Sequence, residues 1–221
     1  MSTSQETPVL RLPSTPPPPI LTLTPKTHTT IEIRPFHIFD ARPVARIANN
    51  PRIASCMRNT FPYPYTSKDA NHWLLIATRS YSDPETKPTK SGKPLLLDYA
   101  IIVNGVLVGD IGLKPLWDVE SDTFEIGYWL GEEFWGVGIM TAVLKEFIAW
   151  VWEQFPTVRR LEAMVFDFNE GSKKVLSRVG FVQEGVKREA VRKGDKIHDM
   201  VVFGLLRREW TTQVLSVSGE P

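Results

Sequence analysis

The chain has 221 residues, of which 42% are hydrophobic, and this supports the core of one domain but not of two full enzyme domains. Its 26 Lys and Arg against 25 Asp and Glu give a formal net charge of +1, which makes no electrostatic case for nucleic acid or an anionic membrane as partner. The single cysteine, Cys56, excludes an intrachain disulfide and a thiol-based metal site, and no run of about 18 apolar residues occurs. We therefore expect a cytoplasmic protein that binds a small molecule or a peptide.

The first 28 residues are dominated by Pro, Ser and Thr, with isolated Leu and Val. Such a composition buries too little apolar surface to offset the cost of ordering, so we predict a disordered, proline-rich N-terminal tail over residues 1–28. A polyproline II ligand for the aromatic groove of a partner is the alternative interpretation. One folded domain is then expected over residues 29–211, with a flexible C-terminal tail over residues 212–221.

The N-terminal part of the domain alternates short elements with loops. TIEIRP, residues 30–35, has the alternation of a strand that Pro35 ends. A short helix is predicted from about Asp40, interrupted by the turn-forming NNP and followed by one or two further helical turns. After the stiff aromatic loop FPYPY, Thr66 or Ser67 opens a helix that runs to about residue 80, and the polar residues 81–94 predict another loop.

The centre and the C-terminal part are rich in predicted strands. Asn104-Gly105 between two apolar runs favours a tight hairpin over residues 95–113, and residues 122–130 form a third strand. Apolar residues every three to four positions predict a long helix over residues 138–155, with a face wide enough to lie across a sheet. A strand, a short helix and two strands follow, at residues 159–166, 169–180, 181–191 and 198–206. This order indicates an α+β fold without a long βαβ series.

The stretch FWGVGIM places Gly136 and Gly138 directly before the long helix. Thr141 stands where a dinucleotide fingerprint needs its third glycine, and no Gly-Lys-Ser/Thr follows, so neither a Rossmann nor a Walker phosphate loop is supported. A tight loop between a strand and a helix still leaves the first helical amides unpaired, and these amides and the helix dipole favour an anion. A simple flexible joint before a core helix is the alternative.

Several motifs in order resemble the GNAT superfamily of acyl-CoA-dependent N-acyltransferases. They are EIGYWL, the WGVG turn, N-x-x-S at Asn169 to Ser172, RVGF, Glu184-Gly185 and HDMVVFGLLRREW. The resemblance covers residues 30–210 and is strongest to the RimJ/RimL-type branch, the ribosomal-protein N-terminal acetyltransferases and their relatives. It implies a mixed, mostly antiparallel, twisted sheet of about seven strands flanked by helices.

The same resemblance implies an activity. An acetyl group would pass from acetyl-CoA to a primary amine, on a protein or peptide N-terminus or a small molecule, by direct attack in a ternary complex. No metal would be needed, and the protein would be a monomer or a homodimer. The position of Cys56, well before the catalytic strands, argues against a covalent acetyl-enzyme. The rival interpretation is a catalytically weak acyl-CoA-binding sensor or interaction module, which Val137, Met140, Leu176 and Val191 favour.

The resemblance also implies a set of cofactor-binding residues. The strand end would contact the pantetheine arm, the glycine loop would hold the pyrophosphate, and Asn169 would bond the pantetheine amide. The loop lacks its common basic residue, so Lys173, Lys174 or Arg178 could supply the charge, although a solvated basic face is the alternative. The predicted set is Tyr128, Trp129, Leu130, Trp135, Gly136, Val137, Gly138, Ile139, Met140, Asn169, Ser172 and Lys174.

Two residues are predicted to act in the reaction. Glu125, in the strand before the loop, is the candidate base, because partial burial would raise its pKa and a water could relay the proton. A solvent-facing or salt-bridged glutamate is the alternative, and Glu189 is a second candidate on the assumption of a regular strand. Leu176 occupies the place of the tyrosine that protonates the thiolate in many relatives, so the resemblance assigns that step to Ser172.

An acceptor pocket and a possible dyad complete the candidates. The resemblance places the acceptor wall at Phe61, Tyr63, Tyr65 and Trp73, with ordinary packing as the alternative. His198 and Asp199 are neighbours in one strand and face opposite sides, so we do not expect them to form a dyad.

Overall fold

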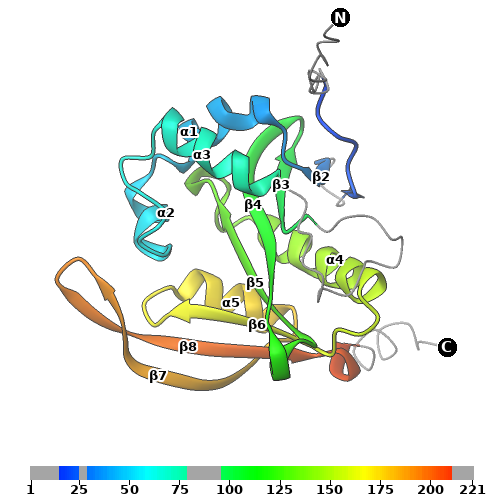
Figure 1. The fold of residues 1–221 in the computed structure, drawn as a ribbon, viewed down its shortest axis with the longest axis vertical. Helices are drawn as coiled ribbons and strands as arrows, with labels where there is room; N and C mark the ends of the chain where they lie inside the picture. Colours follow the sequence, from blue (N-terminus) through cyan, green and yellow to red (C-terminus); the bar gives the residue numbers. More distant parts are fainter. Residues whose placement is uncertain (1–14, 25–28, 79–95, 211–221) are drawn as a thin grey trace, which may run out of the picture.

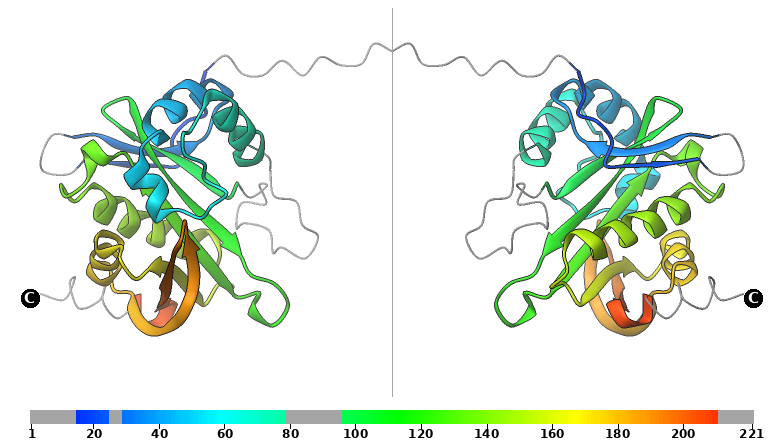
Figure 2. Two further views of the ribbon diagram at one scale, coloured as in Figure 1. Left: turned by 90° about the vertical axis from the view of Figure 1, so that its left-hand side faces the viewer. Right: turned by 90° about the vertical axis from the view of Figure 1, so that its right-hand side faces the viewer.

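The computed structural model describes residues 15–24, 29–78 and 96–210. Figure 1 shows a twisted sheet between two groups of helices, and Figure 2 shows that α1 and α3 cover one face while α4 and α5 cover the other. The helices are α1 Ala41–Ala48, α2 Pro51–Cys56, α3 Ser67–Ala77, α4 Ile139–Gln154 and α5 Glu170–Arg178, with short 3-10 helices at Ile38–Asp40, Asp118–Glu120 and Glu132–Phe134. The strands are β1 Leu21–Leu23, β2 Ile31–Pro35, β3 Asp98–Val103, β4 Val106–Pro115, β5 Thr123–Leu130, β6 Arg160–Phe166, β7 Val182–Lys193 and β8 Lys196–Leu206.

The predicted α+β class is confirmed, with one strand more than expected. The sheet has eight strands in the order β1-β2-β3-β4-β5-β6-β8-β7, and every neighbouring pair is antiparallel except β5 and β6. The additional strand is β1, which lies within the segment predicted as a disordered tail and pairs with β2. Its apolar side chains Leu21 and Leu23 pack against the core. The free energy of burying them offsets the entropic cost of ordering a segment whose other residues are mostly polar or proline. Residues 1–14, 25–28, 79–95 and 211–221 lie outside the described residues.

Two local patterns determine the centre of the fold. Asn104 and Gly105 both adopt positive φ, at 49° and 79°, as the two-residue hairpin turn between β3 and β4 requires. The apolar stripe of α4 is buried, and Phe147 lies 5.7 Å from the ring of Tyr99 on β3. Trp150 stacks on Phe147 at 5.3 Å and thus extends this contact along the helix. The predicted hairpin and the predicted long helix therefore form the central part of the core.

Strands β5 and β6 separate soon after they meet. Their parallel pairing covers Thr123 to Glu125 on β5 and Arg160 to Glu162 on β6, and no pairing is formed beyond these residues. Figure 1 shows the two strands diverging from that point. The facing edges of β5 and β6 past the split present backbone groups that an extended ligand can hydrogen-bond.

Candidate active site

The loop between β5 and α4 carries a helix N-terminus without a side-chain cap. Gly136 and Gly138 have φ values of 77° and 86°, which only glycine adopts at low cost, and Gly138 is the N-cap of α4. Within the part of the chain that the structure describes, no side chain caps the first amides of this helix. The indole Nε1 of Trp135 donates to the carbonyl oxygen of Leu130 at 2.8 Å and thus holds the loop against the end of β5. The arrangement leaves an amide-rich, electropositive helix end.

A pocket of about 490 Å³ opens at this helix end. Four parts of the chain line it: the end of β5, the loop with the start of α4, α5 with the residues before it, and α2. The lining residues are Arg52, Ile53, Ser55, Cys56, Met57, Tyr128, Trp129, Leu130, Phe134, Trp135, Gly136, Gly138, Ile139, Met140, Thr141, Phe168, Asn169, Glu170, Gly171, Ser172, Val175 and Arg178.

The pocket brings together ten of the twelve residues predicted to bind the cofactor. The two that do not line it are Val137 and Lys174. Val137 is 71% exposed at the tip of the loop, and Lys174 lies on the exposed side of α5. The ammonium of Lys173 donates to the carbonyl of Asp167 at 2.7 Å and pairs with Glu170. Of the three cations suggested by the sequence, Arg178 is the one that reaches the pocket.

The start of α5 is held by side-chain hydrogen bonds. Asn169 is its N-cap, and its Oδ1 accepts from the backbone N–H of Ser172 at 3.1 Å. The hydroxyl of Ser172 lies 2.9 Å from the hydroxyl of Tyr128, which arrives from β5. Burial raises the pKa of Tyr128 well above its ordinary value, against a smaller opposing effect of the bond to Ser172. This pair of hydroxyls in the pocket did not follow from the sequence.

Helix α2 forms a side of the pocket that the sequence did not predict. The guanidinium of Arg52 lies 5.3 Å from the ring centre of Trp135 and pairs with Glu132. The hydrogen bond from Asn50 and the charge of Arg52 hold the pKa of Glu132 below its ordinary value, although burial opposes them. Cys56, at the end of α2, lies in the same pocket wall. Its distance along the sequence from the catalytic strands therefore does not separate it from the site.

The tip of the β7–β8 hairpin is fastened to the segment that contains α2. Lys193 donates to the carbonyl oxygens of Ala54 at 3.0 Å and Met57 at 2.8 Å, and to Oδ1 of Asn59 at 3.0 Å. These acceptors use all three donors of the ammonium. The left view of Figure 2 shows the hairpin curling toward α2. No local sequence pattern could have indicated these contacts, because the partners are more than 130 residues apart.

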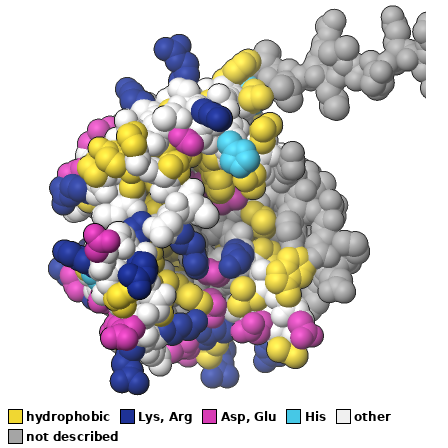
Figure 3. All heavy atoms as spheres, turned by 60° about the vertical axis from the view of Figure 1, so that its left-hand side comes forward, with side chains coloured by type: hydrophobic (Ala, Val, Ile, Leu, Met, Phe, Trp, Pro, Cys, Tyr) yellow, Lys and Arg dark blue, Asp and Glu magenta, His cyan; other side chains and the backbone are white. Residues whose placement is uncertain are grey.

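Glu125 lies on the opposite face of β5 from Tyr128. Alternation along the strand places Phe124, Ile126 and Tyr128 toward α4 and α5, and Glu125 on the other side. The carboxylate pairs with Arg58 at 3.2 Å and with Lys114 at 3.3 Å, and it does not line the pocket. The geometry of Glu125 is therefore that of the salt-bridged glutamate that the sequence left as the alternative. Figure 3 shows that Lys and Arg side chains are interspersed with Asp and Glu on one face of the molecule.

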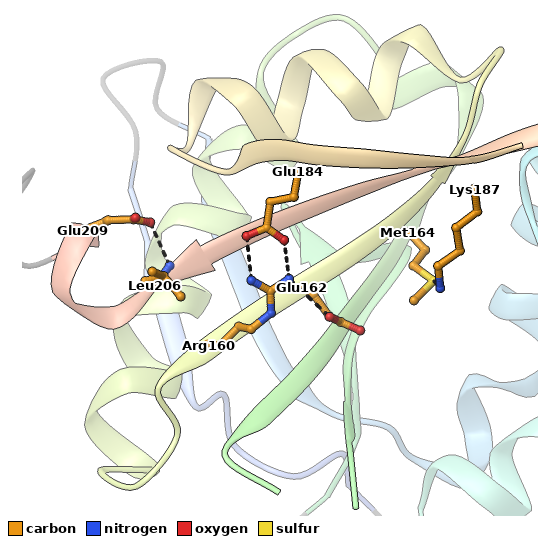
Figure 4. A network of polar contacts seen from close by, with 7 residues as sticks. All are labelled: Arg160, Glu162, Met164, Glu184, Lys187, Leu206 and Glu209. Carbon is orange, nitrogen blue, oxygen red and sulfur yellow. Dashed lines mark hydrogen bonds and ion pairs between the residues drawn. The ribbon is translucent and has the colours of Figure 1, made fainter. Parts of the chain in front are cut away.

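A second network of charges lies beside Glu125 (Figure 4). Glu162 is the register partner of Glu125 on β6. Arg160 pairs with Glu162 at 3.4 Å and makes two hydrogen bonds to Glu184, at 2.7 and 2.6 Å. Gly204 on β8 permits this contact, since a Cβ there would collide with Arg160 and Glu184. None of these residues lines the pocket, and the mutual pairing of the charges indicates a structural role.

The predicted acceptor wall separates into buried and exposed parts. The ring of Phe61 lies 4.8 Å from Tyr65 and 5.8 Å from Trp129, and Trp129 also lines the pocket. Tyr65 is buried, Trp73 is partly buried against the core, and Tyr63 is 55% exposed. Phe61 and Tyr65 therefore approach the pocket through Trp129, whereas Tyr63 and Trp73 belong to the surface and to the core packing.

The remaining candidates do not converge on the pocket. The assumption of a regular strand at Glu189 is wrong, because the register of β7 shifts between Lys187 and Val191 and Glu189 has a φ of 52°. Its N–H donates to Asp199, and its side chain is exposed. His198 pairs with Asp167 at 3.2 Å, so it forms no dyad with its neighbour Asp199.

A candidate metal site and a membrane-spanning helix are both absent from residues 15–24, 29–78 and 96–210. No group of three or more His, Cys, Asp or Glu side chains there could hold a metal ion. No helix in the same ranges is long and apolar enough to cross a membrane.

A family model and several relatives of known sequence point to the same protein family. Residues 30–182 match the family described as Acetyltransferase (GNAT) domain. The chain is 31% identical over 182 residues to the uncharacterized N-acetyltransferase p20 of Bacillus licheniformis, covering 81% of this chain and 94% of that protein. It is 35% identical over 114 residues to YdaF of Bacillus subtilis, which is named as a ribosomal N-acetyltransferase, covering 52% of this chain and 61% of that protein.

Solved structures share the fold. RimJ of Mycobacterium smegmatis, in complex with CoA-disulfide, superposes with a TM-score of 0.67 at 19% identity, over 86% of this chain and 90% of that one. RimL, a ribosomal-protein acetyltransferase in complex with coenzyme A, gives a TM-score of 0.66 at 20% identity, over 83% and 97%. At these identities the likeness shows the fold alone.

Proposed function

Because the chain belongs to the GNAT acetyltransferase family, whose members are acyl-CoA-dependent N-acyltransferases, we propose that it transfers an acetyl group from acetyl-CoA to a primary amine. The acceptor is a peptide N-terminus or a small amine, and the protein acts in the cytoplasm as a monomer or a homodimer. One observation carries the proposal. The uncapped N-terminus of α4, Asn169 and Ser172 border a single pocket at the split between β5 and β6.

The cofactor would bind along the split. Its pyrophosphate lies at the amides that follow Gly138, where the helix dipole favours negative charge. Arg52 and Arg178, which border the pocket from α2 and α5, supply the positive charge that the loop itself lacks. The pantetheine arm runs beside the unpaired edge of β5, and Nδ2 of Asn169, whose Oδ1 is already used by the helix cap, faces the arm as a donor.

The reaction is direct attack in a ternary complex. The amine nitrogen attacks the thioester carbonyl and loses a proton, which passes through water to Glu125 on the face of β5 opposite Tyr128. When the C–S bond breaks, the sulfur keeps the electron pair and takes a proton from Ser172, so that CoA leaves as a thiol. Among the described residues, the one recorded polar neighbour of the Cys56 thiol is the hydroxyl of Ser55 at 3.8 Å. A cysteine without an adjacent base is a poor nucleophile, which favours direct attack.

A catalytically weak acyl-CoA-binding sensor is the second candidate. Two observations favour it. Glu125 is held by Arg58 and Lys114, and Leu176, in the place of the usual acid, is fully buried in the core. Such a protein would bind the cofactor through the same pocket but would not turn it over.

The test is to incubate the purified protein with acetyl-CoA and a panel of peptides and small amines. Release of free thiol and the mass of the product report turnover, and the rise in unfolding temperature with acetyl-CoA reports binding. Turnover on an acceptor supports the enzyme, whereas stabilisation without turnover on any acceptor supports the sensor. Absence of both would refute the cofactor site. Glu125→Gln and Ser172→Ala then test the two assigned roles, and rates equal to the unmodified protein would remove these residues from the mechanism.

A further inference from the structure

The contact between Tyr128 and Ser172 joins two elements at the reacting end of the pocket. Tyr128 lies on β5, three residues beyond the last register pair with β6, and Ser172 lies in the first turn of α5. Their hydroxyl oxygens are 2.9 Å apart, and both residues line the pocket. The backbone of Ser172 is fixed independently by the cap from Asn169. The hydroxyl of Ser172 therefore has a defined partner, Tyr128, and it projects from a backbone position that the helix cap holds in place.

The direction of the hydrogen bond follows from the donor inventory. A phenol has one O–H, and Ser172 is the one recorded partner of the Tyr128 hydroxyl in the described part of the chain. Burial raises the pKa of Tyr128, so the phenol keeps its proton over the whole physiological range. The distance fits donation by either hydroxyl, but a buried O–H without an acceptor is costly, and we therefore assign Tyr128 as the donor and Ser172 as the acceptor. The single O–H of Ser172 is then left for another acceptor.

This direction determines where the Ser172 proton points. A serine in a helix commonly donates to the carbonyl four residues earlier, which here belongs to Phe168. When the Ser172 oxygen accepts a hydrogen bond from Tyr128, the rotation of the Ser172 hydroxyl is restricted. The same bond also polarises the O–H of Ser172. Because Ser172 lines the pocket, a proton restricted in this way is available to an acceptor there, where the sulfur of a bound thioester would lie.

We propose that Tyr128 is a positioning residue for Ser172 in acetyl transfer, and that it reaches the site from β5 because the usual tyrosine position on α5 is filled by the buried Leu176. The inference rests on the proposed function. In the step concerned, the C–S bond breaks, the sulfur keeps the electron pair, and the Ser172 proton moves to the sulfur. Ser172 regains a proton from solvent, and the proton lost by the amine passes through water to Glu125 and from there back to solvent. Tyr128 keeps its proton throughout.

The experiment compares four proteins with the acceptor found in the panel above: the unmodified chain, Tyr128→Phe, Ser172→Ala and the double variant. Phenylalanine keeps the ring and removes only the hydroxyl. We expect Tyr128→Phe to lower kcat about fivefold to tenfold, which corresponds to about 1 kcal/mol, with the KM for acetyl-CoA unchanged within about twofold. In the Ser172→Ala background the same change should have no further effect on kcat, because the hydroxyl that Tyr128 orients is absent.

The matched control is Tyr99→Phe, which removes another buried phenol on the same side of the sheet but outside the pocket. Its kcat should equal that of the unmodified protein. Equal kcat in Tyr128→Phe and the unmodified protein overturns the proposal, as does an equal loss in the presence and absence of Ser172, which would indicate a structural effect. If the unmodified protein binds acetyl-CoA but turns over no acceptor, the proposed function itself fails.

Discussion

A pair of carboxyl groups on β3 and β4, partly buried at Asp98 and buried at Asp110, should make the stability of the protein depend on pH. Asp98 pairs with Gly112 and Asp110 pairs with Ala100, so the two aspartates lie on the same face of adjacent strands. Asp110 is 5% exposed, and its Oδ2 has no hydrogen-bond partner among the described residues. Burial raises the pKa of Asp98 to about 7, while burial and the charge of Asp98 raise that of Asp110 well above its ordinary value.

The direction and size of the effect follow from proton linkage. The ordinary pKa of Asp98 is 3.8, so between about pH 4 and pH 7 the unfolded chain loses a proton that the folded protein keeps. Stability is therefore highest at the acidic end of this range and falls as the pH rises through the folded pKa. A pKa difference of about three corresponds to about 4 kcal/mol when the loss is complete, a large part of the 5–15 kcal/mol typical of folded domains.

Two tyrosines among the described residues interact electrostatically with the pair. Burial, followed by the charges of Asp69 and Asp110, raises the pKa of Tyr65 to about 12, and burial with the charge of Asp98 raises that of Tyr99 further. Both phenols are neutral below pH 9. They add no charge of their own to the pair in the range concerned.

The assay is urea unfolding of the unmodified protein and of Asp98→Asn at intervals from pH 5 to pH 8.5. With asparagine standing in for the protonated carboxyl, the unmodified protein should already be about 1–2 kcal/mol less stable than the variant at pH 5, and this difference should grow by about 3 kcal/mol toward the alkaline end. Asp195→Asn makes the same change in charge at the exposed turn between β7 and β8 and should follow the unmodified protein. Parallel curves for the unmodified protein and Asp98→Asn over this range would refute the reasoning.

Three further changes test the site and its surroundings. Gly138→Ala should cost about 1–2 kcal/mol in unfolding and weaken CoA binding by calorimetry, because its φ of 86° is unfavourable for alanine although a Cβ meets no atom there. Gly185→Ala on β7, without positive φ and outside the pocket, is the control, and equal CoA affinities in the two variants would contradict this prediction. Lys193→Met should speed hydrogen exchange in the β7–β8 hairpin and lower the free energy of unfolding by about 1–3 kcal/mol, since three hydrogen bonds are lost. Lys196→Met is the control and should have neither effect, and equal exchange in both variants would argue against the contact. Cys56→Ala should keep its transfer rate within about twofold in the thiol-release assay, as direct attack requires, and loss of activity with an acetylated thiol in the unmodified protein would favour a covalent route.

Local chemistry made the central elements predictable. The turn at Asn104 and Gly105 and the stripe along α4 each follow from a pattern of adjacent or periodic residues, and both are found as expected. Strand β1 was not predictable in the same way, because three residues in a proline-rich context carry too little periodicity. Its stability comes from pairing with β2 and from packing on the core, which only the folded chain supplies.

The candidate site also divides into residues that local sequence patterns predict and residues whose contacts depend on the folded chain. Asn169, Ser172 and the two glycines of the loop are close in sequence to the elements that position them, and they line one pocket. Alternation along β5 could have shown that Tyr128 faces the helices, but not that it meets Ser172, because the contact depends on how α5 is placed. The shift of register in β7 invalidated the expectation for Glu189, and no turn residue in the sequence marks that bulge.

The contacts of α2 connect the glycine loop to the β7–β8 hairpin. Arg52, near the start of this helix, stacks on Trp135 of the glycine loop, whereas Lys193 of the hairpin holds the carbonyls of Ala54 and Met57 at its other end. The helix has six residues, so a displacement of the hairpin reaches Arg52 within roughly two turns. Because the loop itself carries no cation, the electrostatic field at the start of α4 depends on where Arg52 is held. Freeing the hairpin should therefore alter the affinity for an anion as well as hairpin mobility, which distinguishes a mechanical link through α2 from local loosening alone.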